Sequence, residues 1–485
     1  ELGNGKLADT NTITVGEAGS KATPVDVWAK TAGTAPAVKL SGDLRTATAQ
    51  LDENGKPMDG QVVRGADQIH LQNVNIHNSF TLADRTKMLA DDMAAITSEA
   101  ADKLKLGQPA DGNDGVDVWQ KTQTDLLNSK YDKLNLTGLQ IATTTVNPEF
   151  DVDNGVWTTA AKTVIPTDPN ILLDNLNITL QNDSVGGTST AISLSKTGNH
   201  ILANGGVFDA GNLAEANVLD ITGADNLVEF RGSTLKGDIR SDATGNTVNL
   251  TNGSLLAGNA IAVTGNLHLN LDNSTWNGGV GPNSPDVSLS NNSVWNVKGY
   301  HASVNALSLS GSNSINLINS DGLAQLGGHG FTGKKSAVIL SVDTDLTSDG
   351  KGVTSVLAGT YSPDSLHSLT GTGLADNYQF GTLHVNGLAT GGKYALSVES
   401  AGAEPYTIGG RLADGADGTS AHAFVSYKTS ESRVVTGQDG KPVSQNVTSD
   451  ADFTSLSAPA ELGVYQYAAE KVMDGVNNRT NIYYR

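Results

Sequence analysis

The sequence predicts an all-β protein, a right-handed three-stranded parallel β-helix (a solenoid) with N-terminal insertions that include one helix. Three observations predict this fold class. From about residue 171 onward, short runs of alternating apolar and polar residues recur at intervals of about 20 residues, the period of a β-helix coil. Turns rich in Asn, Gly, Ser and Asp separate the runs. The chain has 485 residues, more than one compact core usually organises, and a right-handed winding is the usual one for such solenoids.

Four consecutive segments show the repeat most clearly. They read NLVEFRGSTLKGD, NTVNLTNGSLLAGN, LHLNLDNSTWNGG and DVSLSNNSVWNVKG. Each contains an alternating strand, a polar turn, a serine and a large apolar residue two positions later. The serines are Ser233, Ser254, Ser274 and Ser293, and the apolar residues are Leu235, Leu256, Trp276 and Trp295. Equivalent residues of successive coils lie above one another in a solenoid, so these positions predict two ladders.

The two tryptophans of the repeat allow two interpretations. Trp276 and Trp295 occupy the position that leucine holds in the two preceding coils, and they share the parity of the serines. This favours an internal ladder. The alternative is an external platform on which a ligand stacks.

The first part of the chain repeats poorly. A stripe of apolar residues at steps of three and four predicts a helix at about residues 81–106. Leu51–Val63 and Thr436–Val447 each contain a hairpin-turn dipeptide followed by Lys-Pro, so both segments predict projecting hairpins. Insertions on one side of a solenoid often form its binding face, and the alternative is that they shield an end of the stack. Three tryptophans fall in this irregular part: Trp28, Trp119 and Trp157.

These features divide the chain into three predicted parts. Residues 1–170 form N-terminal coils with insertions, and residues 171–330 form regular coils. Residues 331–485 form C-terminal coils and a stabilising segment.

Composition narrows the function classes. The net charge of −20 opposes long-range attraction to nucleic acid and to anionic membranes. There is no cysteine, which suits a chain that crosses a membrane unfolded, although a cytosolic protein low in cysteine would look the same. No apolar run approaches the roughly 20 residues of a membrane span. The N-terminal residues do not resemble a signal peptide, so we expect a mature form.

Catalytic motifs are scarce. The sequence has no GxSxG, HExxH, Walker-type or GDSG motif, and ADGADG (Ala413–Gly418) is only a faint calcium-repeat pattern. We therefore predict no catalytic residues, no metal site and no cofactor. The enzymatic alternative is a polysaccharide lyase or hydrolase, which would place Asp, Lys or Arg across neighbouring coils.

One segment, RGSTLKGDIR, is the densest basic stretch of an acidic chain. We predict ligand binding, with charge-assisted hydrogen bonds to a carboxylate or sulfate, by its residues Arg231, Lys236, Asp238 and Arg240. Asp117 and Trp119 of the irregular region are further candidates for ligand binding. The alternative for the basic segment is a solvated coil edge.

The C-terminal third resembles a known family. GTLHVNGLATGGKYALSVESAGAEP (Gly381–Pro405) is similar to the segment near the end of autotransporter passenger domains, and SLSGSNSINLIN (Ser308–Asn319) resembles the coil before it. The chain thus resembles passengers of type V secretion of Gram-negative bacteria, of the AIDA and pertactin kind, and among these the UpaB-type adhesins. The resemblance implies a three-faced β-helix exported through the periplasm. It also implies that the segment of residues 331–485 folds first and that a C-terminal barrel in the outer membrane follows.

Three functions remain open from the sequence. The first is a virulence-related adhesin at the bacterial cell surface or in the extracellular space, which binds a host matrix protein such as fibronectin, a glycosaminoglycan, or both. The second is self-association in cell aggregation or biofilm. The third is the polysaccharide enzyme. The acidic balance predicts that glycosaminoglycan binding is salt-sensitive and confined to one patch.

Overall fold

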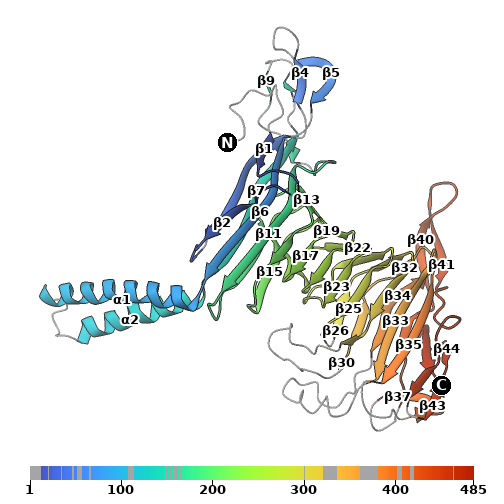
Figure 1. The fold of residues 1–485 in the computed structure, drawn as a ribbon. Helices are drawn as coiled ribbons and strands as arrows, with labels where there is room; N and C mark the ends of the chain where they lie inside the picture. The colour runs from blue at the N-terminus through green and yellow to red at the C-terminus, as the bar shows by residue number, and fades with distance from the viewer. Residues whose placement is uncertain are drawn as a thin grey trace.

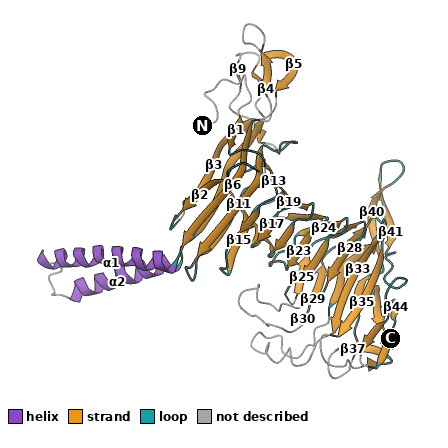
Figure 2. Cartoon of the chain, viewed as in Figure 1, coloured by secondary structure: helices purple, strands orange, loops and turns teal. Residues whose placement is uncertain are grey.

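The protein is a long stack of strands. The computed structural model describes residues 12–19, 21–33, 35–45, 48–51, 57–64, 67–106, 114–147, 150–151, 156–157, 162–163, 165–299, 301–319, 336–360, 381–400, 407–414, 420–462 and 464–485. Over these residues the fold is mostly β, and a large, mainly parallel sheet nearly closes on itself in a solenoid-like form (Figures 1 and 2). The strands follow one another along the long axis in chain order (Figure 1).

Two neighbouring ladders of parallel strands form the central part of the stack. The first ladder contains β16 (Leu227–Arg231), β19 (Asn246–Thr251), β22 (Leu267–Asp272), β24 (Asp286–Ser290) and β27 (Leu307–Ser310). The second contains β17 (Thr234–Lys236), β20 (Leu255–Ala257), β23 (Thr275–Gly278), β25 (Val294–Val297) and β28 (Asn313–Asn316). Each rung supplies one strand to each ladder, so the predicted repeat corresponds to the rungs.

The turn between the two ladders explains why Asn and Gly recur there. Asn252 and Asn273 have φ values of 55° and 48°. Asn73 and Asn175, in earlier rungs, have φ values of 48° and 50°. Asn and Gly adopt this left-handed region with the least strain. The polar turns of the sequence therefore fix where each rung bends.

A third ladder runs beside the first two. It contains β3 (Pro36–Arg45), β7 (Leu136–Asn147), β12 (Thr188–Leu194), β15 (Glu215–Ile221), β18 (Asp238–Ser241) and β21 (Ala260–Ala262). Nearer the C-terminus, four further parallel strands form a comparable series: β26 (His301–Val304), β31 (Ile339–Val342), β34 (Thr382–Thr390) and β39 (Val425–Lys428).

Long strands form the N-terminal rungs. β6 (Gln68–Phe80) pairs in parallel with β11 (Ile171–Asn182) over almost its whole length. β1 (Thr12–Val15) and β2 (Val25–Ala29) pair in parallel with β6. On the other side of β11, β13 (His200–Asn204) and β14 (Val207–Asp209) connect it to β16 and β17.

The interior of the stack contains the ladders that the repeat predicted. The four serines are buried, and the hydroxyl of Ser254 accepts a hydrogen bond from the backbone N–H of Ser233 (3.1 Å). Trp276 and Trp295 are fully buried, with ring centroids 4.3 Å apart and planes 4° from parallel. Their indole N–H groups donate to the carbonyls of Gly258 (2.9 Å) and Gly278 (3.0 Å). The internal interpretation is confirmed.

Two helices project from the side of the N-terminal rungs (Figure 2). α1 (Leu82–Lys105) is the predicted helix, and a capping box between Thr81 and Asp84 begins it. α2 (Asp114–Asp132) was not predicted, so the prediction of one helix is wrong for the described residues. Its apolar residues Val116, Leu127 and Tyr131 are separated by polar residues, so no continuous stripe marks it.

The two predicted hairpins are present. β4 (Thr48–Leu51) pairs antiparallel with β5 (Pro57–Arg64), and β40 (Ser430–Thr436) pairs antiparallel with β41 (Pro442–Thr448). The turn of the first hairpin and most of ADGADG lie outside the described residues. The boundaries of the three predicted parts stay predictions.

An antiparallel sheet and buried aromatic residues close the C-terminal end. β39 pairs with β45 (Arg479–Tyr484), which pairs with β44 (Ala469–Asp474). Behind this sheet, the rings of Tyr394 and Phe453 stack with centroids 4.0 Å apart. Neither helix of the described chain is long and apolar enough to cross a membrane.

Candidate binding face

The predicted basic segment does not form one patch. Arg231 ends β16, Lys236 ends β17 and Arg240 lies in β18, so the three side chains belong to three different ladders. Each also lies beside a carboxylate. The pairs are Arg231 with Glu229 (3.8 Å), Lys236 with Asp209 (3.5 Å), and Arg240 with Asp220 (2.9 Å) and Asp242 (3.2 Å). These carboxylates oppose the local positive charge that a polyanion requires.

Asp238 is the first residue of β18. Its carboxylate accepts the backbone N–H of Asn259 in the next rung (2.7 Å), and the side chain of Asn259 accepts the N–H of Gly279 one rung further (2.9 Å). Burial raises the pKa of Asp238 to about 6, against the lowering effect of the Asn259 bond. Asp238 therefore belongs to a series of side-chain-to-backbone bonds that connects the rungs.

Asp117 and Trp119 lie on α2, which projects away from the rungs that carry the basic segment (Figure 1). Asp117 is exposed. Trp119 is half-buried, and the ammonium of Lys103 on α1 lies 4.8 Å from its ring centroid. The structure does not bring these two residues together with the basic segment. The side chain of Trp157 lies outside the described residues.

An exposed aromatic pair lies at the N-terminal end of the second ladder, and sequence reasoning did not select it as a site. Trp28 of β2 is in register with His77 of β6. Their rings stack with centroids 3.9 Å apart and planes 7° from parallel. Trp28 is nonetheless 75% exposed. The alternation of residues along β2 indicates that the Trp28 side chain faces outward. Val25 and Val27 pack against the core, whereas Asp26 and Trp28 face solvent.

A chain of hydrogen bonds begins at Asp26, two residues before Trp28, and crosses the neighbouring rungs. Asn75 donates to the carboxylate of Asp26 (2.8 Å), and Asn177 donates to the side-chain oxygen of Asn75 (2.9 Å). The backbone N–H of Val207 donates to the side-chain oxygen of Asn177 (2.8 Å). These bonds hold Asp26 in a defined orientation beside Trp28.

Similar polar contacts continue along the outside of the stack. Side chains of neighbouring rungs bind one another on outward positions of both ladders and in the turn between the ladders. The amide pairs are Asn175 with Asn73, Asn270 with Asn249, and Asn296 with Asn277, at 2.7–2.9 Å. Since each amide is held by its neighbour, the outer surface is a preorganised array of donors and acceptors.

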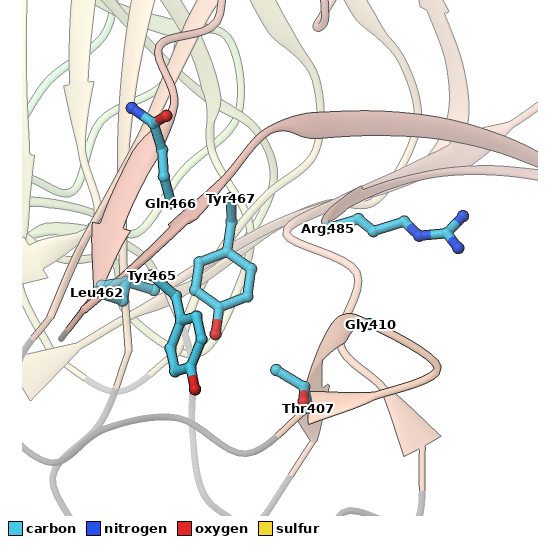
Figure 3. Close-up of a pocket in the computed structure, with 7 residues that line it drawn as sticks. All are labelled: Thr407, Gly410, Leu462, Tyr465, Gln466, Tyr467 and Arg485. Atoms are coloured by element: carbon cyan, nitrogen blue, oxygen red, sulfur yellow. The ribbon is translucent and has the colours of Figure 1, made fainter.

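A cavity of about 450 Å³ lies near the C-terminal end (Figure 3). The rings of Tyr465 and Tyr467 lie side by side in it, with centroids 6.5 Å apart and planes at 59°. Its other lining residues are Thr407, Gly410, Leu462, Gln466 and Arg485. Arg485 lies 3.4 Å from Glu470, so part of its charge is neutralised. Two phenol rings and the side chains of Thr407 and Gln466 thus line the cavity.

Comparison with known proteins identifies no relative: no family model, no curated protein and no solved structure matches the chain. Within the described ranges, no group of three or more His, Asp or Glu side chains is arranged to hold a metal ion.

Proposed function

We propose that this chain is an adhesive passenger of a type V secretion system, displayed at the bacterial cell surface or released from it. In this proposal the solenoid is a right-handed three-faced β-helix, residues 331–485 stabilise it during export, and an outer-membrane barrel anchors it. The outer flank binds an extracellular macromolecule of the host.

One observation carries the proposal: on the outside of the stack, four asparagine amides donate hydrogen bonds to asparagine side chains of the adjacent rung. A surface whose donors and acceptors are already ordered loses little conformational entropy when a partner binds. Because the array repeats along a long axis, it suits an extended partner such as a matrix-protein strand or a glycan chain.

The charge distribution indicates which extracellular partners should bind more tightly. The acidic chain and the carboxylates beside Arg231, Lys236 and Arg240 oppose a sulfated polyanion. We therefore expect a matrix protein such as fibronectin or a weakly charged glycan to bind more tightly than heparin.

A binding panel tests the proposal. The purified chain is passed over immobilised fibronectin, laminin, collagen, heparin and neutral glycans by surface plasmon resonance at two salt concentrations. Saturable binding to at least one of them supports adhesion, and binding to none would overturn it.

Two further measurements separate the alternatives. Analytical ultracentrifugation over a range of concentrations detects self-association, which would favour a role in cell aggregation. Chain shortening or unsaturated ends after incubation with acidic polysaccharides would favour the enzyme.

A further inference from the structure

The exposed pair Trp28–His77 has a geometry that a purely structural contact does not need. The imidazole of His77 covers one face of the indole at 3.9 Å, and Trp28 remains 75% exposed. An indole in water exposes a large apolar area, which costs free energy unless a partner covers it. Because His77 holds the ring nearly parallel to its own plane, the outer face is a rigid, flat surface that a ligand meets without first ordering it.

Polar groups lie beside this surface on the same strand. Asp26 precedes Trp28 by two residues and faces the same way, so the two side chains emerge about 7 Å apart. The bond from Asn75 orients the Asp26 carboxylate. On the other side of Trp28, Lys30 lies 2.8 Å from Asp84 of α1, and this bond lowers the pKa of Asp84 to about 2. Lys30 is thus neutralised by Asp84, and Asp26 leaves the surface slightly acidic.

The shape and charge of the surface discriminate between ligands that bind to aromatic rings. A quaternary ammonium is typically enclosed by a cage of several aromatic rings, whereas here one flat face is presented. A nucleobase would bring phosphates toward Asp26 and toward a chain with a net charge of −20. A pyranose ring has a flat apolar face of C–H groups and a rim of hydroxyls, which matches an indole face with a carboxylate beside it.

We propose that the Trp28–His77 surface binds a neutral pyranose of a glycan chain, with the sugar ring stacked on Trp28 and its hydroxyls donating to Asp26. The inference rests on the proposed adhesive function and names a ligand class for one part of the flank.

Saturation-transfer difference NMR and isothermal titration with the full chain test the proposal. The probes are neutral hexasaccharides of β-linked glucose, galactose and mannose, with oligogalacturonate and a heparin hexasaccharide as anionic comparisons. We expect at least one neutral probe to bind, and its Kd to rise at least tenfold in Trp28→Ala. We expect Trp28→Phe to retain binding within about threefold, because a flat ring is kept. Asp26→Ala should raise the Kd by a factor between about three and ten.

The matched control is Met473→Ala on β44, which removes an exposed apolar side chain at the other end of the chain. Its Kd for the neutral probe should equal that of the unaltered protein. Far-UV circular dichroism of every variant shows whether the β-structure is kept. Asp26→Ala keeps the Trp28–His77 stack, so it tests the site even if Trp28→Ala misfolds.

The outcomes are distinct. The inference is overturned if no neutral probe binds, if only anionic probes bind, or if a folded Trp28→Ala or Asp26→Ala protein binds like the unaltered one. Adhesion as a function stands in those cases as long as the panel of matrix proteins and glycans gives saturable binding. If that panel also gives none, the proposed function fails as well.

Discussion

Two stacked aromatic pairs in this protein have nearly the same geometry and opposite surroundings. Trp276 and Trp295 are partners in register on β23 and β25, and Trp28 and His77 are partners in register on β2 and β6. Their planes are 4° and 7° from parallel, respectively. Both central tryptophans are 0% exposed, whereas Trp28 is 75% exposed.

The parity of the strand makes the difference. Trp276 shares its side of the strand with the buried Ser274, and Trp28 shares its side with the exposed Asp26. Stacking between rungs follows from the parallel register on either side of the sheet, so it does not reveal burial. The neighbours at i ± 2 do reveal it, and they separate an aromatic residue that stabilises the fold from one available to a ligand.

The largest expected effect is on the buried pair. Trp295→Ala leaves a cavity beside Trp276 and should lower the free energy of unfolding by about 3–5 kcal/mol. Urea denaturation followed by far-UV circular dichroism measures it. A loss of less than about 1 kcal/mol would contradict the internal ladder and would remove the contrast between the two pairs.

The next effect concerns Asp238, a charge at the boundary between inside and outside. Its pKa is raised from 3.8 to about 6, so the folded state is penalised when the carboxylate is ionised. Below about pH 4 the carboxyl is protonated in the folded state, and its burial does not lower the free energy of unfolding. As the pH rises through about 6 the buried carboxyl ionises, and the free energy of unfolding falls. Asp238→Asn keeps the acceptor for Asn259 and should raise the free energy of unfolding by roughly 2–3 kcal/mol at pH 8.

The same substitution should have almost no effect at pH 3.5, where the native carboxyl is protonated. Asp439→Asn, in the exposed turn of the β40–β41 hairpin, is the matched control and should change the free energy of unfolding by no more than about 0.5 kcal/mol. An equal gain at both pH values would show that burial of the charge is not the cause.

A buried serine gives a smaller effect. Ser254 donates to the carbonyl of Thr251 (2.8 Å) and accepts the N–H of Ser233. Ser254→Ala leaves that buried N–H without this acceptor and should cost about 1–3 kcal/mol in denaturant unfolding. Thr275→Ala is the comparison and should cost much less, because Thr275 directly follows Ser274, the equivalent serine of the next rung, and faces outward. Equal costs would contradict the assignment of sides.

The smallest effect is expected at the exposed pair. Trp28→Ala removes a ring that contacts mainly His77 and solvent, so the free energy of unfolding should change by no more than about 0.5–1 kcal/mol. The same denaturation experiment measures it. A loss of unfolding free energy comparable to that of Trp295→Ala would show that Trp28 is part of the core. The two aromatic pairs would then not differ in their role.

The sequence by itself determined the repeat, its turns and the interior of the regular rungs. Alternation along a strand and the left-handed conformation of Asn are local properties, so they suffice to assign Ser233, Ser254 and Trp276 to the inside. Helix α1 was also predictable from its apolar residues at steps of three and four. The polar interruptions in α2 removed that signal.

Only the tertiary structure decided which outward side chains meet. Insertions lie between the N-terminal rungs, so β6 and β11 are in contact although the two helices, β7 and three two-residue strands separate them in sequence. The pairing of Trp28 with His77 depends on backbone register between different rungs, and so do the pairings of Lys236 with Asp209 and of Arg240 with Asp220. Insertion length is arbitrary and one residue of register reverses every side chain, so spacing in the sequence does not specify these contacts.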